Sequence, residues 1–318
     1  MKAICITAAG DLEICDHPLP IAGPGEILIK VAASGMNRAD LLQRKGHHPP
    51  PAGVSDLPGL EVSGIIEAVG DDVSPAMIGE RVCALIEGGG YAEYAVAKIS
   101  QSFQVPDDLD LIKAAGLPEA LFTVTKNVFI IGQLRADDHL LIHGGASGIG
   151  TLAIQMAKSV GAFVTATAGT DEKCNLLKAL GADLAVNYKT ENLADAIQGN
   201  GIDVVLDMAG GATLTRDLAI MNVDGRHVSI AYMENRTAEI DIATIMKKRL
   251  VITGSTLRHD SPEQKEDYAE MIREIFWPEI AAGGIKPVIH ATYPLEQAQK
   301  AHDAFAEGRH AGKILLTL

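Results

Sequence analysis

A glycine-rich segment between an apolar run and an amphipathic run carries the strongest chemical signal in the sequence. Apolar residues 140–142 lead into the glycines, and apolar residues then recur at helical spacing over 149–160. Backbone amides at the start of such a helix bind the diphosphate of a dinucleotide, because they lie at the positive end of the helix dipole. The glycines do not follow the strict G-x-G-x-x-G order, so a tight strand–helix turn without a ligand stays the alternative. The predicted contacts are Gly145, Ser147, Gly148 and Ile149.

Two other patterns of reactive residues have simpler interpretations. Segment 145–149 differs from the G-x-S-x-G nucleophile elbow of hydrolases at its fifth residue, Ile149, and no His or acid partner is evident downstream. We therefore interpret Ser147 as a phosphate contact. Tyr94 and Lys98 match the Tyr-x-x-x-Lys pair of short-chain dehydrogenases, but they precede the glycines and lie in a strand-like run. This match is interpreted as coincidence.

The segment that would bind the adenosine ribose contains no acid. Domains that prefer NAD carry an Asp or Glu about 20 residues beyond the glycines, where it binds the ribose hydroxyls. Counting from Gly148 leads to residues 168–170, which are small and leave room for a 2′-phosphate. The acids at 171–172 could repel a phosphate, although they also suit the first turn of a helix behind a Thr N-cap. The predicted contacts here are Gly169 and Thr170, and the predicted cofactor is NADPH.

Composition and charge exclude several classes of protein. The 318 residues include 27 Lys and Arg against 41 Asp and Glu, and the net charge of −14 repels a nucleic-acid backbone. The four cysteines form no C-x-x-C pair, so we expect neither a disulfide framework nor a zinc ribbon, and we expect a cytoplasmic location. The N-terminus has no signal-like apolar segment, and glycines and polar residues interrupt the uncharged stretch 140–157. We expect no membrane span.

The elements that must position these residues fall into two textures. Up to about residue 120, short apolar runs separated by Pro and Gly predict an antiparallel β-rich domain. Strands then alternate with helices over 121–258, which predicts a doubly wound parallel sheet of the α/β class. The last segment, 259–318, departs from this alternation: a long helical stretch from 262 to 282 precedes two strands and a helix.

Together, these segments resemble the quinone oxidoreductases of the medium-chain dehydrogenase/reductase superfamily, in particular the tumour-suppressor-inducible branch. The resemblance covers essentially the whole chain and implies a GroES-like catalytic domain (1–120 with 259–318) around a Rossmann domain (121–258), with the active site between them. The segments that carry it, besides the glycine loop, are 32–40, 59–64, 79–82, 88–94, 117–120 and 187–189.

Zinc chemistry does not fit this sequence. Zinc alcohol dehydrogenases of the same superfamily have a Cys and a His where this chain resembles them at Asn37 and Leu60, and the four-Cys structural lobe is absent. An asparagine and a leucine do not replace a thiolate and an imidazole as zinc ligands. Without zinc to polarise an alcohol, an electron-poor acceptor such as a quinone or an activated alkene is the expected substrate.

The resemblance also implies roles for single residues. Asn37 would reach the nicotinamide ribose or the substrate, with a turn or cap residue as the alternative. His48 stands where the family often has a tyrosine lining the active site; it could donate a proton, or it could be a solvated loop histidine. Lys173 matches the phosphate-binding lysine of the family and Tyr188 a tyrosine that hydrogen-bonds the 2′-phosphate.

The sequence thus predicts an NADPH-dependent, zinc-independent quinone oxidoreductase. An enone or alkenal reductase needs the same hydride geometry, and a cofactor-binding structural protein of the crystallin type is the alternative from another class. The apolar run 250–254 is expected to be the edge strand of the Rossmann sheet. A bare apolar edge favours pairing, so we predict a homodimer, as the resemblance also implies.

Overall fold

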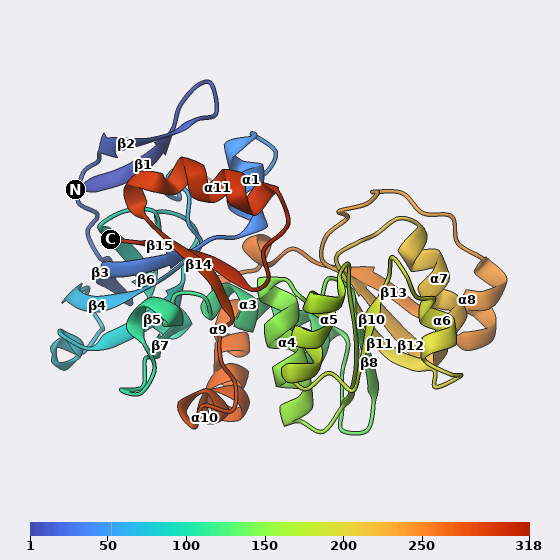
Figure 1. Ribbon diagram of the computed structural model, residues 1–318. Helices are drawn as coiled ribbons and strands as arrows, with labels where there is room; N and C mark the ends of the chain where they lie inside the picture. The colour runs from blue at the N-terminus through green and yellow to red at the C-terminus, as the bar shows by residue number, and fades with distance from the viewer. Residues whose placement is uncertain (52) are drawn as a thin grey trace. The chain divides into compact units, whose positions relative to one another are not determined.

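The chain forms two units, each with its own sheet (Figure 1). The computed structural model describes residues 1–51 and 53–318. Unit 1 comprises Met1–Phe122, Ser261–Gly283 and Pro287–Leu318, and unit 2 comprises Thr123–Asp260 and Gly284–Lys286. The C-terminal part of the chain therefore returns to the unit that contains the N-terminus.

Unit 1 is built on a seven-stranded sheet in which the order is β14-β15-β3-β4-β5-β7 and β6 pairs with β3. The C-terminal strand β15 lies antiparallel to β3, which joins the two ends of the chain in one sheet. Apolar side chains of β3, β4, β5 and β6 form its core. The strands of this unit are β1 Lys2–Ile6, β2 Leu12–Asp16, β3 Glu26–Gly35, β4 Glu61–Val69, β5 Arg81–Leu85, β6 Tyr94–Lys98, β7 Ser102–Gln104, β14 Ile289–Pro294 and β15 Lys313–Thr317.

Helices of unit 1 lie in the loops of this sheet and in the C-terminal segment. The predicted helical stretch 262–282 is present, but a π-helical segment, Ile272–Phe276, separates its two α-helices. Short 3₁₀ turns occur at Pro75–Met77, Ile99–Gln101 and Leu295–Gln297. The α-helices are α1 Arg38–Arg44, α2 Leu111–Ala114, α3 Pro118–Val124, α9 Pro262–Met271, α10 Trp277–Ala281 and α11 Ala298–Ala306.

Unit 2 contains a six-stranded sheet in the order β10-β9-β8-β11-β12-β13, and every pairing is parallel. This order reverses between β8 and β11, and such a reversal opens a binding crevice at the carboxyl ends of the strands. All four residues of β8 are buried, as expected for a strand covered on both faces. The strands are β8 His139–Ile142, β9 Phe163–Ala168, β10 Leu184–Asn187, β11 Ile202–Asp207, β12 Met221–Ser229 and β13 Val251–Gly254.

The helices of unit 2 connect these strands, as the alternation predicted. A π-helical segment, Thr125–Ile131, and a 3₁₀ turn, Leu257–His259, lie at the two ends of the unit. Strand β13 is at the edge of the sheet, as predicted for residues 250–254. The α-helices are α4 Gly148–Ser159, α5 Asp171–Ala179, α6 Leu193–Ala196, α7 Ala212–Ile220 and α8 Ile242–Lys248.

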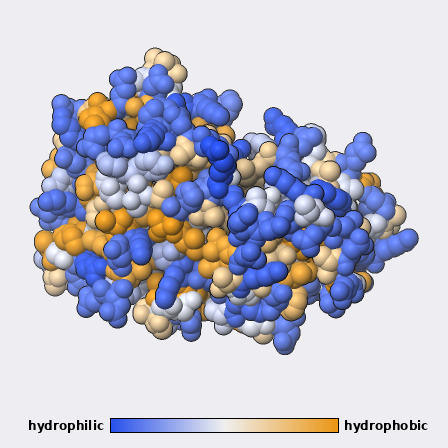
Figure 2. All heavy atoms as spheres, viewed as in Figure 1, coloured by the Kyte–Doolittle hydropathy of each residue, from blue (hydrophilic) through white to orange (hydrophobic). Residues whose placement is uncertain are grey.

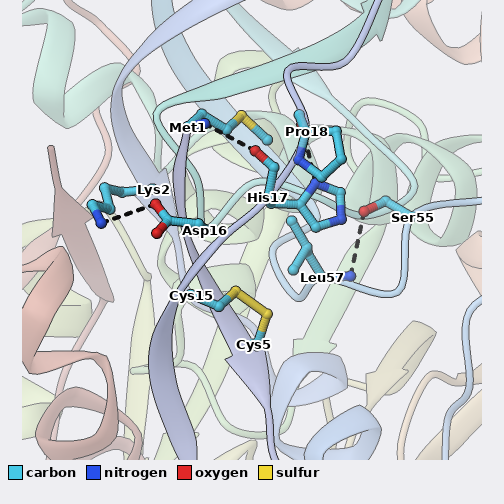
Figure 3. Close-up of a disulfide and its surroundings, with 9 residues drawn as sticks. All are labelled: Met1, Lys2, Cys5, Cys15, Asp16, His17, Pro18, Ser55 and Leu57. Carbon is cyan, nitrogen blue, oxygen red and sulfur yellow. Dashed lines mark hydrogen bonds and ion pairs between the residues drawn. A yellow bond between two sulfur atoms is a disulfide. The ribbon is translucent and has the colours of Figure 1, made fainter.

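A disulfide joins Cys5 and Cys15, so the expectation that the cysteines form no disulfide is wrong (Figure 3). The two residues belong to the antiparallel hairpin β1–β2, in which Ala3 pairs with Cys15 and Cys5 with Glu13. This register brings their Cα atoms to 5.9 Å, within the range that a disulfide spans. The sequence spacing alone contains no sign of the hairpin register. The other two cysteines are free and buried.

One helical stretch, Leu111–Ile131, is long and apolar enough to cross a membrane by length and composition alone. Within its most apolar window, 78% of the stretch is buried inside the protein, as in the core helix of a folded domain. The face drawn in Figure 2 is covered mainly by hydrophilic side chains, in line with the net charge of −14.

Candidate functional site

The glycine loop joins β8 to α4 and exposes the start of that helix. Ser147 is the N-cap residue: its Oγ accepts the amide of Gly150 at 2.9 Å. A Cβ at Gly150 would lie 2.5 Å from the carbonyl oxygen of Gly144, so only glycine allows this close return of the loop. Gly148 and Ile149 are partly exposed and begin the helix, where backbone amides have no helical partner. The loop thus has the free amides and the open backbone that a diphosphate requires.

Gly145 has a structural role in the loop, and its predicted contact with the cofactor stays a prediction. Its amide donates to the carbonyl oxygen of Thr167 at 2.9 Å, so this N–H already has a partner. A Cβ at Gly145 would lie 2.9 Å from the side chains of Ala166 and Leu177. Gly145 therefore lets the loop pack against β9 and α5, which is a structural requirement of the loop.

The residues predicted for the adenosine end meet at the carboxyl end of β9. Thr170 caps α5, and its Oγ1 accepts the amide of Lys173 at 3.3 Å. A Cβ at Gly169 would lie 2.7 Å from the hydroxyl oxygen of Tyr188 and 3.3 Å from Cε of Lys189. Burial, and then the positive charge of Lys189, lower the pKa of Lys173. The Tyr188 hydroxyl and the Lys189 side chain therefore lie at Gly169, and the charge of Lys189 acts on Lys173.

Sequence reasoning did not identify Lys189 as part of this group. Lys189 directly follows Tyr188 in the chain, and this position beside a predicted contact is the signal that could have identified it. The acids that were expected to oppose a phosphate are partly held elsewhere: Asp171 Oδ1 accepts the side-chain amide of Asn187 at 2.7 Å. Glu172 is exposed in the first turn of α5, where an acid is favourable.

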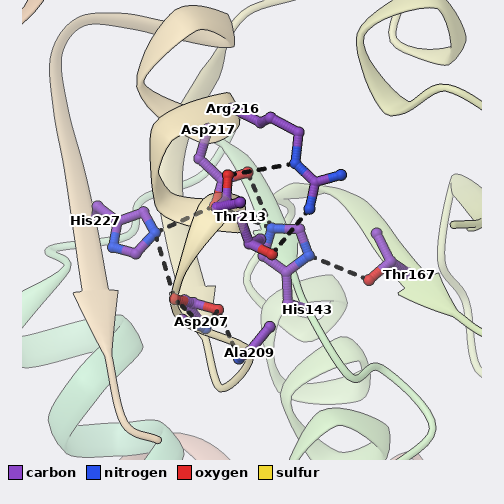
Figure 4. Close-up of polar contacts among 10 residues, drawn as sticks. His143, Thr167, Asp207, Ala209, Thr213, Arg216, Asp217 and His227 are labelled. Carbon is purple, nitrogen blue, oxygen red and sulfur yellow. Dashed lines mark hydrogen bonds and ion pairs between the residues drawn. The ribbon is translucent and has the colours of Figure 1, made fainter. Parts of the chain in front are cut away.

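A buried polar network lies beneath these loops (Figure 4). The carboxylate of Asp217 in α7 lies between two imidazoles: His143 Nε2 is 3.0 Å from both oxygens and His227 Nε2 is 3.2 Å from one. Burial opposes the charged form of His143, but the Asp217 carboxylate raises its pKa above the ordinary value. His143 immediately precedes the glycine loop, so this pair fixes the place where the loop begins.

The same network holds the turn after β11. Asp207 is fully buried, and its Oδ1 accepts the amide of Ala209 at 2.7 Å while Oδ2 accepts that of Gly210 at 3.1 Å. His227 lies 3.7 Å from the Asp207 carboxylate. The network thus links the carboxyl ends of β8 and β11, the two strands between which the order reverses. Sequence reasoning missed it, because His143 is 74 residues from Asp217 in the chain and no spacing motif connects them.

In unit 1, Asn37 belongs to a second buried network. Its Nδ2 donates to Glu61 Oε1 at 2.9 Å, and its Oδ1 accepts from Lys313 Nζ at 2.8 Å. Lys313 also forms an ion pair with Glu61, and Glu61 Oε2 accepts the amide of Glu119 at 2.9 Å. Glu61 is thus bonded within unit 1. Neither Lys313, 276 residues away from Asn37, nor Glu119 was predicted here.

Asp40, in the first turn of α1, extends this network. Its carboxylate accepts the amides of Asn37 at 2.7 Å and Gly59 at 3.0 Å, and the Tyr91 hydroxyl at 3.3 Å. Burial raises the pKa of Asp40 to about 6, although the two amides favour its charged form. The Tyr91 oxygen is 3.3 Å from His302 Nε2, and burial lowers the pKa of His302 to about 4. The start of α1 is therefore rigidly held.

His48 lies in the loop that follows α1 and is partly exposed. His48 and Asn37 both belong to unit 1. Asn37 precedes α1 in the sequence, and His48 follows it. The other predicted contacts, from Gly145 to Tyr188, all belong to unit 2. In unit 2, Gly169, Thr170, Lys173 and Tyr188 lie at neighbouring strand ends, whereas in unit 1 the structure shows no contact between Asn37 and His48 among the described residues.

Zinc does not fit the residues at Asn37 and Leu60. Both polar atoms of the Asn37 side chain are engaged by Glu61 and Lys313, and the Leu60 side chain is apolar and buried. In residues 1–51 and 53–318, no group of three or more His, Cys, Asp or Glu side chains is arranged to hold a metal ion. The absence of zinc stays a prediction that rests on this donor set.

Two family models match the chain: an alcohol dehydrogenase GroES-like domain over residues 23–107 and a zinc-binding dehydrogenase over residues 148–277. Human quinone oxidoreductase is 32% identical over 331 residues, which cover 100% of this chain and 98% of that protein. The pig quinone oxidoreductase is 33% identical with the same coverage. The structure is similar to that of the quinone oxidoreductase from Thermus thermophilus, solved also as its complex with NADPH: the TM-score is 0.85, at 29% identity and 100% coverage of both chains.

Proposed function

Since this chain belongs to the quinone oxidoreductases of the medium-chain dehydrogenase/reductase superfamily, we propose that it is an NADPH-dependent enzyme that reduces a quinone without zinc. That it is an oxidoreductase follows from the family. The choice of NADPH, the quinone acceptor, the absence of zinc and the roles of single residues are the proposal.

The two lysines at this end of the sheet are the observation that carries the choice of cofactor. Lys189 lies with the Tyr188 hydroxyl at Gly169, its charge acts on Lys173 in the first turn of α5, and no acid stands at 168–170. An unphosphorylated ribose carries no charge that would neutralise two neighbouring ammonium groups, whereas a 2′-phosphate neutralises both. The T. thermophilus relative solved with NADPH supports the same choice.

Different residues would bind the diphosphate, the 2′-phosphate end and the acceptor. The amides of Gly148 and Ile149 and the positive end of α4 would hold the diphosphate, and Thr170, Lys173, Tyr188 and Lys189 the 2′-phosphate end. Bound NADPH supplies the hydride. Asn37 would act from its fixed position between Glu61 and Lys313, and His48 from the loop after α1. Because no metal polarises the substrate, the acceptor must already be electron-poor.

An acceptor panel tests this function. Purified protein is mixed with NADPH and, in parallel, with a benzoquinone, a naphthoquinone, an enone and an alkenal, and oxidation of NADPH is followed by absorbance. We expect turnover with the quinones. Turnover with the enone or alkenal alone would make the chain a double-bond reductase. Tight NADPH binding without turnover on any acceptor would favour a structural, crystallin-like protein.

We also propose a homodimer and a cytoplasmic location. The exposed edge strand β13 supports the dimer. Disulfides are rare in a reducing cytoplasm, so the Cys5–Cys15 bond makes the location the part of this proposal that most needs a test. Cell fractionation, combined with the oxidation state of this pair in cells, provides it.

A further inference from the structure

The imidazole of His143, directly before the glycine loop, is bonded on both of its ring nitrogens (Figure 4). Nε2 lies 3.0 Å from both oxygens of Asp217 in α7, and Nδ1 lies 3.2 Å from Thr167 Oγ1 in β9. The carbonyl oxygen of Thr167 also accepts the amide of Gly145, at 2.9 Å. The start of the loop is therefore held to β9 at two points, one of them through the His143 side chain.

These contacts accommodate a proton on each nitrogen of His143. Burial opposes the charged form of Asp217, but the two imidazoles lower the pKa of this carboxyl below its ordinary value. Because a carboxylate only accepts hydrogen bonds, the Nε2 atoms of His143 and His227 both donate to Asp217. Thr167 Oγ1 can accept from Nδ1 of His143, since a hydroxyl both donates and accepts. A doubly protonated His143 thus has a partner for each N–H.

His227 lacks this second partner. Its Nδ1 is buried, and within the part of the chain that the structure describes no atom forms a hydrogen bond with it. A second proton on His227 would create a buried N–H without an acceptor, which is unfavourable. Of the two imidazoles beside Asp217, His143 is therefore the one whose surroundings accommodate the additional proton.

Charged and titratable groups face His143 from three elements. Asp217 and Arg216 belong to α7, Asp207 to β11 and His227 to β12. Burial opposes the charged form of His143, but Asp217, and then Asp207, raise its pKa above the ordinary value of 6.5, and Arg216 offsets part of this. A group with a raised pKa keeps its proton at lower pH and loses it as the pH rises through that value.

We propose that His143 is a positioning residue that couples cofactor binding to a proton: the glycine loop binds NADPH more tightly when this imidazole is protonated. The inference rests on the proposed function, in which the amides at the start of α4 bind the diphosphate. No covalent bond of NADPH changes in this step. Where His143 is neutral in the free protein, binding draws one proton from water to its Nδ1.

Charge and position both favour binding to the protonated form. A neutral His143 leaves the Asp217 carboxylate as an anion beneath a loop that must bind an anionic diphosphate, whereas an imidazolium cancels this charge. A hydrogen bond between two charged groups is also the stronger one, so the protonated imidazole holds the loop more firmly to α7. By reciprocity, bound NADPH must increase the affinity of His143 for its proton by the same factor.

The first test measures the Kd for NADPH against pH in His143→Gln and His139→Gln. Glutamine retains an N–H donor for Asp217 but does not titrate. His139 is the matched control, because it is a buried histidine at the start of β8 whose ring contacts Thr165 Oγ1 and the carbonyl oxygen of Gly201 instead of a carboxylate. Burial lowers the pKa of His139.

The expected difference is a loss of pH dependence in one variant alone. From about pH 6 to about pH 9, the Kd of the wild type and of His139→Gln should rise about three- to tenfold more than that of His143→Gln, because a difference of one in pKa is a factor of ten in affinity. The 2′-phosphate of the cofactor and Lys173 add the same pH dependence to all three proteins.

The two ways of failing are distinguishable. An equal rise of Kd in the wild type and in His143→Gln overturns the inference, while NADPH binding, and so the proposed function, stands. A wild type that binds NADPH at no pH overturns the proposed function and the inference with it.

A second pair of variants leaves the histidines in place. Valine has the shape of threonine without its oxygen, so in Thr167→Val the Nδ1 of His143 loses its acceptor. We expect this variant to lose pH dependence in the same direction as His143→Gln. Thr165→Val, which removes the partner of His139 in the same strand, should keep the wild-type dependence. Wild-type dependence in Thr167→Val would overturn the inference.

Nitrogen NMR of wild-type protein labelled in its histidines gives an answer that needs no variant. One imidazole should have a pKa above 6.5 in the free protein. On addition of NADPH that pKa should rise by about 0.5 to 1, the equivalent of the three- to tenfold change in affinity. If no histidine changes its pKa when NADPH binds, the inference is wrong, whether or not the variants fold.

Discussion

The NADPH site can be tested at a single lysine. We expect Lys173→Ala to weaken NADPH binding by about 1.5 to 3 kcal/mol, the value of a hydrogen bond to a charged group, with little effect on NADH. Lys178→Ala is the matched control, because Lys178 is exposed in the last turn of the same helix. Calorimetric titration with both cofactors gives the four dissociation constants. Equal losses for NADPH and NADH in Lys173→Ala would show that the lysine does not bind the 2′-phosphate.

His48 has a neighbour that serves as its control. If His48 donates a hydrogen bond to the acceptor, His48→Ala should lower kcat/KM for the quinone about five- to tenfold, the value of roughly 1 to 1.4 kcal/mol. The Kd for NADPH should not change. His47→Ala, in the exposed position before it, should behave as the wild type. Wild-type kinetics in His48→Ala would show that the histidine only fills its loop.

The polar sites show what sequence alone could and could not predict. Gly169, Thr170, Lys173 and Tyr188 were predicted as one group, because the βα turn and the next strand end are close in any parallel sheet. The group around Asn37 could not be predicted in full, since Lys313 reaches it only through the pairing of β15 with β3. His143 likewise reaches Asp217 and His227 only because β11 pairs with both β8 and β12.

At the scale of elements, the disulfide of the β1–β2 hairpin gives a countable result. Protein unfolded in denaturant without reductant should show two reactive thiols per chain, those of Cys83 and Cys174, and four after reduction. Reduction should lower the free energy of unfolding by about 2 to 3 kcal/mol, the loop entropy of a short cross-link. Four thiols before reduction would show that the pair is not bonded.

Elements were predicted well where burial leaves a pattern. The parallel strands of unit 2 are apolar runs between helices, so their order along the chain was readable before the structure. The short helix α1 was not predicted. Its first residues lie in segment 32–40, which was interpreted only through the family resemblance, and its seven residues show little helical periodicity. The π-helical segment Ile272–Phe276 also gave no signal, since it continues the same helical run.

At the scale of the whole molecule, unit 2 exposes apolar side chains on and beside its edge strand β13. Val251 in the strand is 50% exposed, and Met246 and Ile242 in α8 are 73% and 66% exposed. We expect light scattering at micromolar concentration to give twice the 33.5 kDa of the chain. Val251→Lys should give a monomer, because a charge on an apolar edge opposes strand pairing. Ile21→Lys, at an exposed apolar residue of unit 1, should leave the dimer intact. A monomeric wild type would contradict this.

The ratio of kcat/KM for NADPH to that for NADH, measured with a quinone on protein freed of metal by a chelator, tests the central claim most directly. We expect full activity after metal removal and a ratio above about 10, equivalent to about 1.4 kcal/mol of discrimination at the 2′-phosphate. Equal values for the two cofactors, or activity that returns only when zinc is added, would contradict it.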